Sequence, residues 1–401
     1  MHATLRVTKE EVMSMQIEDL DQSTLKNFPD YDKHQKIRHV QDKETGLNAY
    51  LAVHNTNLGP ALGGCRMVRY ASDADAIRDA LRLSRGMTYK NALAGLPLGG
   101  GKSVIIGNPF TEKTEALLEA MGCAVESLGG IYITAEDSGT SEKDMAVIAR
   151  QTSYVLGMPD AKTGIGGNPS PSTALGVFSG IKACARHRYG SEDLSDLIVS
   201  VQGVGAVGIS LCHMLNDAGA KLVVTDVRPE LVAQVQKEIK GVRAVAPSEI
   251  FSVEADIFSP CALGAQINDE TIPQLKVEII AGAANNQLAE ARHAEALAKR
   301  DILYAPDYAI NAGGVIAVAY EYFAISGQNP FHDELSPAAI RTHVIGIGET
   351  LEKIFSLSES RKITTAKAAD ELAESIFRAA GAVNQGSAAS FASGGARKGA
   401  R

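Results

Sequence analysis

The sequence predicts an α/β protein of two domains, and three observations support that prediction. The chain has 401 residues, more than one hydrophobic core usually organises. Its second half alternates strand-like apolar runs with helical segments, which is typical of a parallel sheet covered by helices on both faces. A G-x-G-x-x-G turn joins the first strand and helix of that half and indicates a doubly wound, Rossmann-type domain. The first half is expected to form a mixed α/β domain.

In the first half, three segments carry a clear secondary-structure signal. Residues 46–54 (GLNAYLAVH) alternate apolar and polar residues and predict a strand. Ser72 with Asp75 forms a capping pattern that predicts a helix start, and Ser141 with Asp144 predicts a second one.

A Gly/Pro-rich segment at residues 163–171 (TGIGGNPSP) is expected to join the two domains. A helix over residues 172–189 then ends at Gly190. The strands expected after it are residues 197–202, 221–226, 255–260, 277–282 and 302–306.

These segments suggest a division of the chain. We expect a substrate-binding and oligomerisation domain at residues 1–160, with residues 350–385 packing back onto it, and a dinucleotide-binding domain at residues 161–349. The first dozen residues are expected to be a loose leader, with Met13 or Met15 as alternative starts. Residues 386–401 are small, polar and basic, and predict a disordered tail.

The composition argues against several classes of protein. Lys and Arg total 39 against 47 acidic residues, a net charge of −8 that does not suit nucleic-acid binding. No apolar run reaches the ~18 residues that a membrane span needs. The five cysteines are scattered without a C-x-x-C, and the nine histidines lack metal-ligand spacing. We therefore expect a cytoplasmic protein without a metal, and without a nucleic-acid or membrane partner.

The glycine-rich turn predicts a cofactor site. Gly203, Gly205 and Gly208 permit a tight turn and bring a pyrophosphate close to the helix N-terminus. The next strand ends in Asp226, whose carboxylate would accept the ribose hydroxyls and repel a 2′-phosphate. NAD is therefore favoured over NADP, although Arg228 lies two residues further on.

Two lysines lie in the most unusual stretch of the chain, GMTYKNALAGLPLGGGKSVIIG. Lys102 follows three glycines and precedes an apolar run, so we expect it in a partly dry pocket. Burial disfavours a charged ammonium and lowers the pKa of a lysine. Lys102 could then exchange protons near neutral pH, which an ordinary surface lysine cannot do.

Six segments in order carry a resemblance to a known family. They are residues 58–67, 98–109, 134–140, 259–269, 281–288 and 305–316. The chain resembles the glutamate/leucine/phenylalanine/valine dehydrogenase superfamily, and within it the leucine dehydrogenases, from about residue 40 to about residue 380. The resemblance implies a homo-oligomeric enzyme with its active site in the cleft between the two domains. It also implies NAD-dependent, reversible oxidative deamination of an apolar L-amino acid to a 2-oxo acid and ammonia.

Site roles follow from the same resemblance. Lys90 would pair with the substrate carboxylate, near the backbone of Gly63 and Gly64. Lys102 would activate water and stabilise the carbinolamine, and Asp137 would carry a proton to and from the amino group. In that scheme a hydride leaves Cα, water attacks the resulting iminium, and ammonia is expelled. The cofactor residues it implies are the three glycines with Asp226, Val227, Asn285 and Asn311.

The side-chain pocket favours leucine, isoleucine or valine. Glutamate enzymes of the family place a lysine and a serine where this chain has Leu62 and Val318, and an unpaired buried carboxylate would be costly. Met87, Ala135 and Val315 complete an apolar pocket.

Departures from the leucine dehydrogenase pattern leave the choice of substrate open. Ala317 and Tyr320 replace the usual Asn and Asp, and Cys65 replaces a threonine. Phenylalanine or another bulky amino acid therefore remains an alternative substrate. A second alternative is a catalytically dead NAD-binding homologue, although all three ionisable candidates are present. Cys65 and Cys261 lie in motif segments, but no histidine has a recognisable partnering position for a thiol nucleophile.

Overall fold

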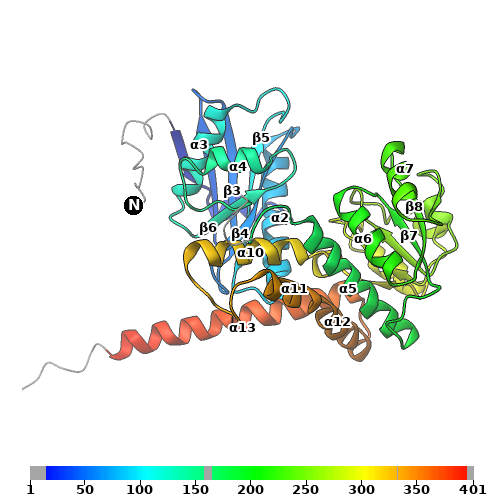
Figure 1. Cartoon of the computed structure of the whole chain (residues 1–401). Helices are drawn as coiled ribbons and strands as arrows, with labels where there is room; N and C mark the ends of the chain where they lie inside the picture. Colours follow the sequence, from blue (N-terminus) through cyan, green and yellow to red (C-terminus); the bar gives the residue numbers. More distant parts are fainter. Residues whose placement is uncertain (1–14, 158–164, 332, 395–401) are drawn as a thin grey trace, which may run out of the picture. The chain divides into compact units, whose positions relative to one another are not determined.

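A computed structural model describes residues 15–157, 165–331 and 333–394 of the chain, with side chains up to residue 382 (Figure 1). The chain forms two compact units, residues 1–159 with 373–401, and residues 160–372. The first boundary lies within one residue of the expected one. The chain returns to the first unit only at residue 373, so helix α12 (Ile347–Arg361) belongs to the second unit and not, as expected, to the first.

The two ends of the chain bear differently on the sequence expectations. The expected leader, residues 1–12, lies outside the described residues. Helix α13 (Thr365–Gly394) runs past residue 386, where a tail was expected to begin, because its small residues carry no helix-breaking proline. Residues 395–401 lie outside the described part.

The first unit is built on a six-stranded mixed sheet in the order β1-β2-β3-β5-β4-β6. β1, β2, β3 and β5 pair antiparallel in turn, whereas β4 pairs parallel with both β5 and β6. The strands are β1 (Met15–Asp19), β2 (Lys36–Asp42), β3 (Leu47–Asn55), β4 (Ala61–Val68), β5 (Gly99–Ile106) and β6 (Tyr132–Glu136). β3 confirms the strand that was predicted at residues 46–54.

Helices bury both faces of this sheet. In β3, Tyr50 and Ala52 pack with helix α2, while Leu51 and Val53 join the cluster that contains helices α3 and α4. This alternation is the two-residue period of a strand that is covered on both sides. The helices of this unit are α1 (Gln22–Leu25), α2 (Asp73–Leu93), α3 (Glu115–Glu126) and α4 (Glu142–Ile148), with the last part of α13.

The two predicted helix starts are both present. The Ser72 hydroxyl caps α2 by accepting the Asp75 N–H, as predicted. α4 begins after Ser141, but there the hydroxyl donates to the Asp144 carboxylate at 2.8 Å and makes no capping bond to the backbone.

The second unit confirms the doubly wound fold. Its six strands are all parallel, in the order β12-β11-β10-β7-β8-β9, so the order reverses at β7, the first strand in sequence. The strands are β7 (Ile198–Gln202), β8 (Lys221–Thr225), β9 (Arg243–Ala244), β10 (Ile257–Pro260), β11 (Ile279–Ile280) and β12 (Leu303–Tyr304). All five predicted strands of this half are present.

The second unit also contains helices, of which α6 follows β7 directly through the glycine turn (Figure 1). They are α5 (Ser170–Tyr189), α6 (Ala206–Asp217), α7 (Pro229–Glu238), α8 (His293–Lys299), α9 (Asp307–Ile310), α10 (Gly313–Ser326), α11 (Pro337–Ile345) and α12, together with the first part of α13. α5 ends at Gly190 in the left-handed conformation (φ 75°), as predicted. In the described part of the chain, no helix combines the length and the apolarity that crossing a membrane requires.

Candidate active site

In the first unit, glycines allow strands β4 and β5 to approach closely. Gly63 on β4 lies so close to the backbone oxygen of Gly101 on β5 that no side chain would fit between them. The buried Tyr132 of β6 connects these two strands, because its hydroxyl lies 2.8 Å from the Gly63 carbonyl oxygen on β4 and 3.0 Å from the Ser103 hydroxyl on β5. The glycine-rich segments of β4 and β5 therefore form a closely packed backbone surface beside Lys102.

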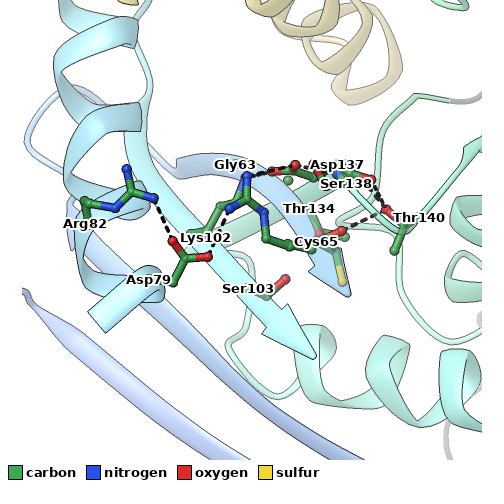
Figure 2. Close-up of polar contacts among 12 residues, drawn as sticks. Gly63, Cys65, Asp79, Arg82, Lys102, Ser103, Thr134, Asp137, Ser138 and Thr140 are labelled. Atoms are coloured by element: carbon green, nitrogen blue, oxygen red, sulfur yellow. Dashed lines mark hydrogen bonds and ion pairs between the residues drawn. The ribbon is translucent and has the colours of Figure 1, made fainter. Parts of the chain in front are cut away.

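Lys102 lies on β5, with only 5% of its surface exposed. Its ammonium forms an ion pair with Oδ2 of Asp137 (Figure 2). Burial lowers the pKa of Lys102 to about 7, and the positive charge of Arg66 adds to that effect. The buried environment predicted for Lys102 is confirmed, whereas proton exchange by this lysine near neutral pH stays a prediction.

Asp137 begins a short loop after β6, and that loop is fixed to the end of β4. The Thr140 hydroxyl accepts the Asp137 N–H at 3.0 Å and lies 2.8 Å from the Cys65 carbonyl oxygen. The Met67 N–H donates to the Ser138 carbonyl at 2.9 Å. A Cβ on Gly64 would lie 2.8 Å from the Asp137 Cβ, so Asp137 sits directly over this glycine. The loop thus holds the carboxylate against Lys102.

Sequence reasoning missed two charged residues of this site. Arg66 on β4 contacts Asp137 Oδ1 at 3.4 Å and Asp79 Oδ2 at 3.0 Å. Asp79, on α2, also appears beside Lys102 in Figure 2. The available signal was an arginine between the buried Cys65 and Met67, because a charge inside a buried strand needs a partner.

The other predicted substrate residues of the first unit lie on α2, β4 and β6, and the Met87 side chain lies next to Gly63. The Met87 side chain lies 3.3 Å from where a Gly63 Cβ would be. Lys90 lies in the last turn of α2, and its charge lowers the pKa of Lys102. Leu62 is buried on β4, and Ala135 is half-buried on β6.

Val315 and Val318 lie on α10 in the second unit, three residues apart and half-buried, so they share one face of the helix. Val318 and Ala317 line a cavity of about 150 Å³ in that unit. The part that Val315 and Val318 play in the substrate pocket stays a prediction.

The glycine turn of the second unit has the backbone geometry that a dinucleotide needs. Gly203 has φ of 92°, and a Cβ there would lie 2.7 Å from the Ala262 Cβ. Gly205 is the N-cap of α6, and Gly208 packs against the Gly203 carbonyl with no room for a side chain. Free N–H groups at this helix start suit a pyrophosphate.

Asp226 follows β8 and is tied to the glycine turn. Its Oδ2 accepts the Val204 N–H and its Oδ1 accepts the Arg228 N–H, each at 2.9 Å. Burial acts to raise the pKa of Asp226, but these bonds outweigh it and the pKa is lowered. The carboxylate is therefore charged at neutral pH. Val227 beside it is 82% exposed.

Two asparagines predicted near the nicotinamide lie together. Asn311 Nδ2 donates to Asn285 Oδ1 at 2.9 Å and to the Ala283 carbonyl at 3.0 Å. Asn311 Oδ1 is buried and has no hydrogen-bond partner among the described residues. A buried acceptor of this kind fits the amide N–H of a nicotinamide carboxamide, so this region fits NAD.

Two other kinds of chemistry find less support. Burial raises the pKa of the Cys65 thiol to about 11 and also raises the pKa of Cys261, so neither thiol suits a nucleophile. Asp269, Glu290 and His293 have potential metal ligand atoms within 4.8 Å of one another. However, Arg292 bridges the two carboxylates and His293 Nδ1 accepts the Glu290 N–H, which favours a surface ion-pair cluster.

Comparisons with known proteins agree with this geometry. Residues 33–154 match the family model described as Glu/Leu/Phe/Val dehydrogenase, dimerisation domain. Residues 224–373 match the model described as Glutamate/Leucine/Phenylalanine/Valine dehydrogenase.

Individual relatives cover most of the chain. It is 50% identical to the leucine dehydrogenase of Geobacillus stearothermophilus, over 85% of this chain and 90% of the relative. It is 42% identical to the phenylalanine dehydrogenase of Caldalkalibacillus thermarum, over 86% and 92%. The crystal structure of L-tryptophan dehydrogenase from Nostoc punctiforme superposes with a TM-score of 0.75 at 42% identity, over 86% of this chain and 96% of that one.

Proposed function

Because the chain belongs to the Glu/Leu/Phe/Val dehydrogenase family, we propose that it oxidises an apolar L-amino acid to its 2-oxo acid and ammonia. Leucine is the first substrate to test, since the leucine dehydrogenase of Geobacillus stearothermophilus is 50% identical. The observation that carries the proposal is the ion pair between the buried Lys102 and Asp137.

The two residues would divide the proton transfers between them. The substrate amine must lose a proton before a hydride can leave Cα, and the Asp137 carboxylate would accept it. Neutral Lys102, with a pKa of about 7, would then take a proton from the water that attacks the iminium. The resulting carbinolamine collapses when its nitrogen regains a proton from Asp137 and leaves as ammonia, while its hydroxyl gives a proton to solvent water and becomes the carbonyl of the 2-oxo acid.

Lys90 would bind the substrate carboxylate. It lies in the last turn of α2, three residues after Met87 and so on the same face of the helix, and a charged lysine pairs well with a carboxylate. Two lysines in different environments can serve two purposes, one as a fixed cation and the other as a proton acceptor. Leu62, Met87 and Ala135 offer apolar surface to the side chain, with Val315 and Val318 proposed to complete it.

NAD is the cofactor we propose. When bound, it supplies the hydride acceptor. The turn of Gly203, Gly205 and Gly208 would hold the pyrophosphate, and the Asp226 carboxylate would accept the ribose hydroxyls next to the exposed Val227. Asn311 would bind the carboxamide through Oδ1, with Asn285 fixing its orientation.

A bulky aromatic amino acid is the second candidate substrate. It is favoured by the small Ala317 side chain, which lines the cavity of about 150 Å³ next to Val318. The L-tryptophan and phenylalanine dehydrogenases named above provide a precedent for larger side chains on this fold. One methylene group in an apolar pocket changes the free energy of binding by only ~1–3 kcal/mol, so overlapping branched-chain activities are expected.

We also propose that the enzyme is a homo-oligomer in the cytoplasm. The match to a dimerisation domain over residues 33–154 supports self-association. Cys65, Cys184 and Cys212 are buried thiols without a disulfide, which suits a reducing compartment. Light scattering coupled to gel filtration tests the assembly directly, and a monomeric mass would contradict it.

A steady-state assay of NADH formation tests the proposed activity. Leucine, isoleucine, valine, phenylalanine, tryptophan and glutamate are compared at saturating NAD, and then NAD is compared with NADP. We expect the highest kcat/KM with leucine and NAD, and none measurable with glutamate. A clear preference for an aromatic substrate would replace leucine by the second candidate. No NADH with any amino acid would mean a catalytically dead homologue.

A further inference from the structure

One arginine connects two carboxylates at the candidate site. Arg66 Nη1 lies 3.0 Å from Asp79 Oδ2, and its Nη2 lies 3.4 Å from Asp137 Oδ1. The side chains of Arg66, Asp79 and Asp137 are only 15–21% exposed. The planar guanidinium thus spans from helix α2 to the loop after β6, and one of its ends reaches the carboxylate that pairs with Lys102.

Asp79 is well suited to hold this arginine in place. It accepts a hydrogen bond from the Tyr70 hydroxyl at 2.8 Å and one from Arg82 Nη2 at 2.8 Å. Burial acts to raise its pKa, but the Tyr70 bond and the charges of Arg66 and Arg82 outweigh burial, so the pKa of Asp79 is lowered. Asp79 is therefore a fixed negative charge with three partners, one on β4, one in the loop after β4 and one on α2.

The local backbone explains why Arg66 reaches Asp137. Gly64 and Arg66 are two residues apart on β4, so they face the same side of the sheet. Asp137 lies over Gly64, where a side chain would collide with it, and Arg66 approaches it from the next position on that face. Oδ1 accepts the Ser138 N–H at 2.5 Å and also faces the arginine, whereas Oδ2 faces Lys102, so the two oxygens have separate partners.

We propose that Arg66, anchored by Asp79, is a positioning residue that holds Asp137 Oδ1 so that Oδ2 stays directed at Lys102 and the substrate nitrogen. This inference rests on the proposed function, because it concerns the orientation of the carboxylate that transfers protons. An Asp137 held at Oδ1 by the Ser138 N–H alone would rotate more freely about χ2 and would present either oxygen, or neither, to the reacting amine. A misplacement of about 1 Å can cost ~10²-fold in rate.

The same two residues act on Lys102 with opposite signs. The charge of Arg66 lowers the pKa of Lys102, and the charge of Asp79 raises it. Lys90 also lowers it, whereas the Cys65 thiol acts in the opposite direction, as does the ion pair with Asp137. These are the charged and titratable groups that face the ammonium from β4, α2 and the loop after β6. Removal of Arg66 and removal of Asp79 should therefore displace the titration of Lys102 in opposite directions.

The test uses three variants and a matched control in the full-length enzyme. Arg66→Met removes the charge, Arg66→Lys keeps the charge without the fork of two N–H groups, and Asp79→Asn keeps the shape without the charge. Arg69→Met is the control, since the Arg69 side chain is 70% exposed and pairs, at 3.9 Å, with the exposed Glu112. Each variant is measured for kcat, for leucine KM, and for the pH dependence of both, with thermal unfolding as a check on folding.

We expect Arg66→Met to lower kcat about 10- to 100-fold with a smaller change in KM. The acidic limb of the pH profile should move to higher pH in Arg66→Met and to lower pH in Asp79→Asn. In Arg66→Lys the limb should lie close to its wild-type pH, whereas kcat should remain below the wild-type value. Arg69→Met should match the wild type. Wild-type kcat and pH profile in Arg66→Met would overturn the proposal. Equal losses of kcat in Arg66→Met and Asp79→Asn with unmoved limbs would also overturn it, because they would indicate a purely structural role.

A second readout does not depend on turnover. The rate at which acetic anhydride acylates Lys102, followed by peptide mass spectrometry at several pH values, reports the titration of this lysine directly. The opposite shifts for Arg66→Met and Asp79→Asn should reappear in this assay. An enzyme that shows these shifts but oxidises no amino acid would contradict the proposed function and not the Arg66 arrangement. An active enzyme without the shifts would contradict the Arg66 arrangement alone.

Discussion

The ammonium of Lys102 on strand β5 forms an ion pair with Oδ2 of Asp137, which lies in the loop after β6. The two residues are 35 positions apart in the sequence and come together because β4 pairs with both strands. In the mechanism we propose, this pair supplies a proton acceptor and a proton carrier to one substrate amino group. The predictions below test that arrangement.

Replacing Lys102 with alanine should lower kcat for oxidative deamination by ~10²–10⁴-fold, because the water that attacks the iminium loses its general base. NADH binding, followed by fluorescence titration, should remain close to that of the wild type, since the cofactor residues lie in the other unit. Lys43→Ala, at an exposed position, is the matched control and should be fully active. Retained activity in Lys102→Ala would refute its role.

The pKa of about 7 at Lys102 predicts the pH dependence. Deamination needs the neutral amine as a base, so kcat/KM should rise as the pH increases through about 7. Reductive amination needs the protonated form, and its rate should fall over the same range. Rate profiles in both directions measure this, and a limb near the ordinary lysine value of ~10.4 would contradict it.

Gly64→Ala should reduce kcat strongly while the fold survives. The new Cβ would lie 2.7 Å from the Glu136 carbonyl oxygen and 2.8 Å from the Asp137 Cβ, so Asp137 must move away from Lys102. Gly86→Ala is the matched control, because a Cβ on this residue of α2 meets nothing within 4 Å. Gly86→Ala should keep its activity and gain ~0.5–1 kcal/mol of stability. Equal activity of the two variants would argue against a fixed Asp137.

Asp226→Ser should weaken the preference for NAD. The charged carboxylate repels a 2′-phosphate, and Arg228 beside it can bind one once Asp226 is gone. The ratio of kcat/KM for NAD to that for NADP should fall by at least ~10-fold. Glu230→Ser, an exposed acid at the start of α7, serves as the control. An unchanged ratio would show that Asp226 does not discriminate between the ribose of NAD and that of NADP.

Much of this arrangement could be predicted from local sequence patterns. The period-two pattern of residues 46–54, the Ser72 cap and the Gly190 end each depend on neighbouring residues only, and each is confirmed. The strand–glycine turn–helix around Gly203 is local as well. Where the capping pattern is present but the hydroxyl has a better acceptor, as with Ser141 and Asp144, the sequence predicts the helix but not the bond.

What could not be predicted depends on contacts between distant segments. Arg66 and Asp79 join the site through the packing of α2 against the sheet, and nothing in their immediate neighbours specifies the third partner, Asp137. The chain rejoins the first unit at residue 373, and no boundary signal in the sequence marks this position. It depends on the packing of α12 on α5, where Gly348 lies beside Ser179.

The most direct test of the central claim is the steady-state oxidation of leucine by the wild type and by Asp137→Asn at saturating NAD. The wild type should form NADH in strict proportion to added leucine. Asp137→Asn should keep a similar leucine KM but lose ~10²-fold or more in kcat, because an amide cannot accept the amine proton. No leucine-dependent NADH in the wild type, or undiminished kcat in Asp137→Asn, would contradict the account.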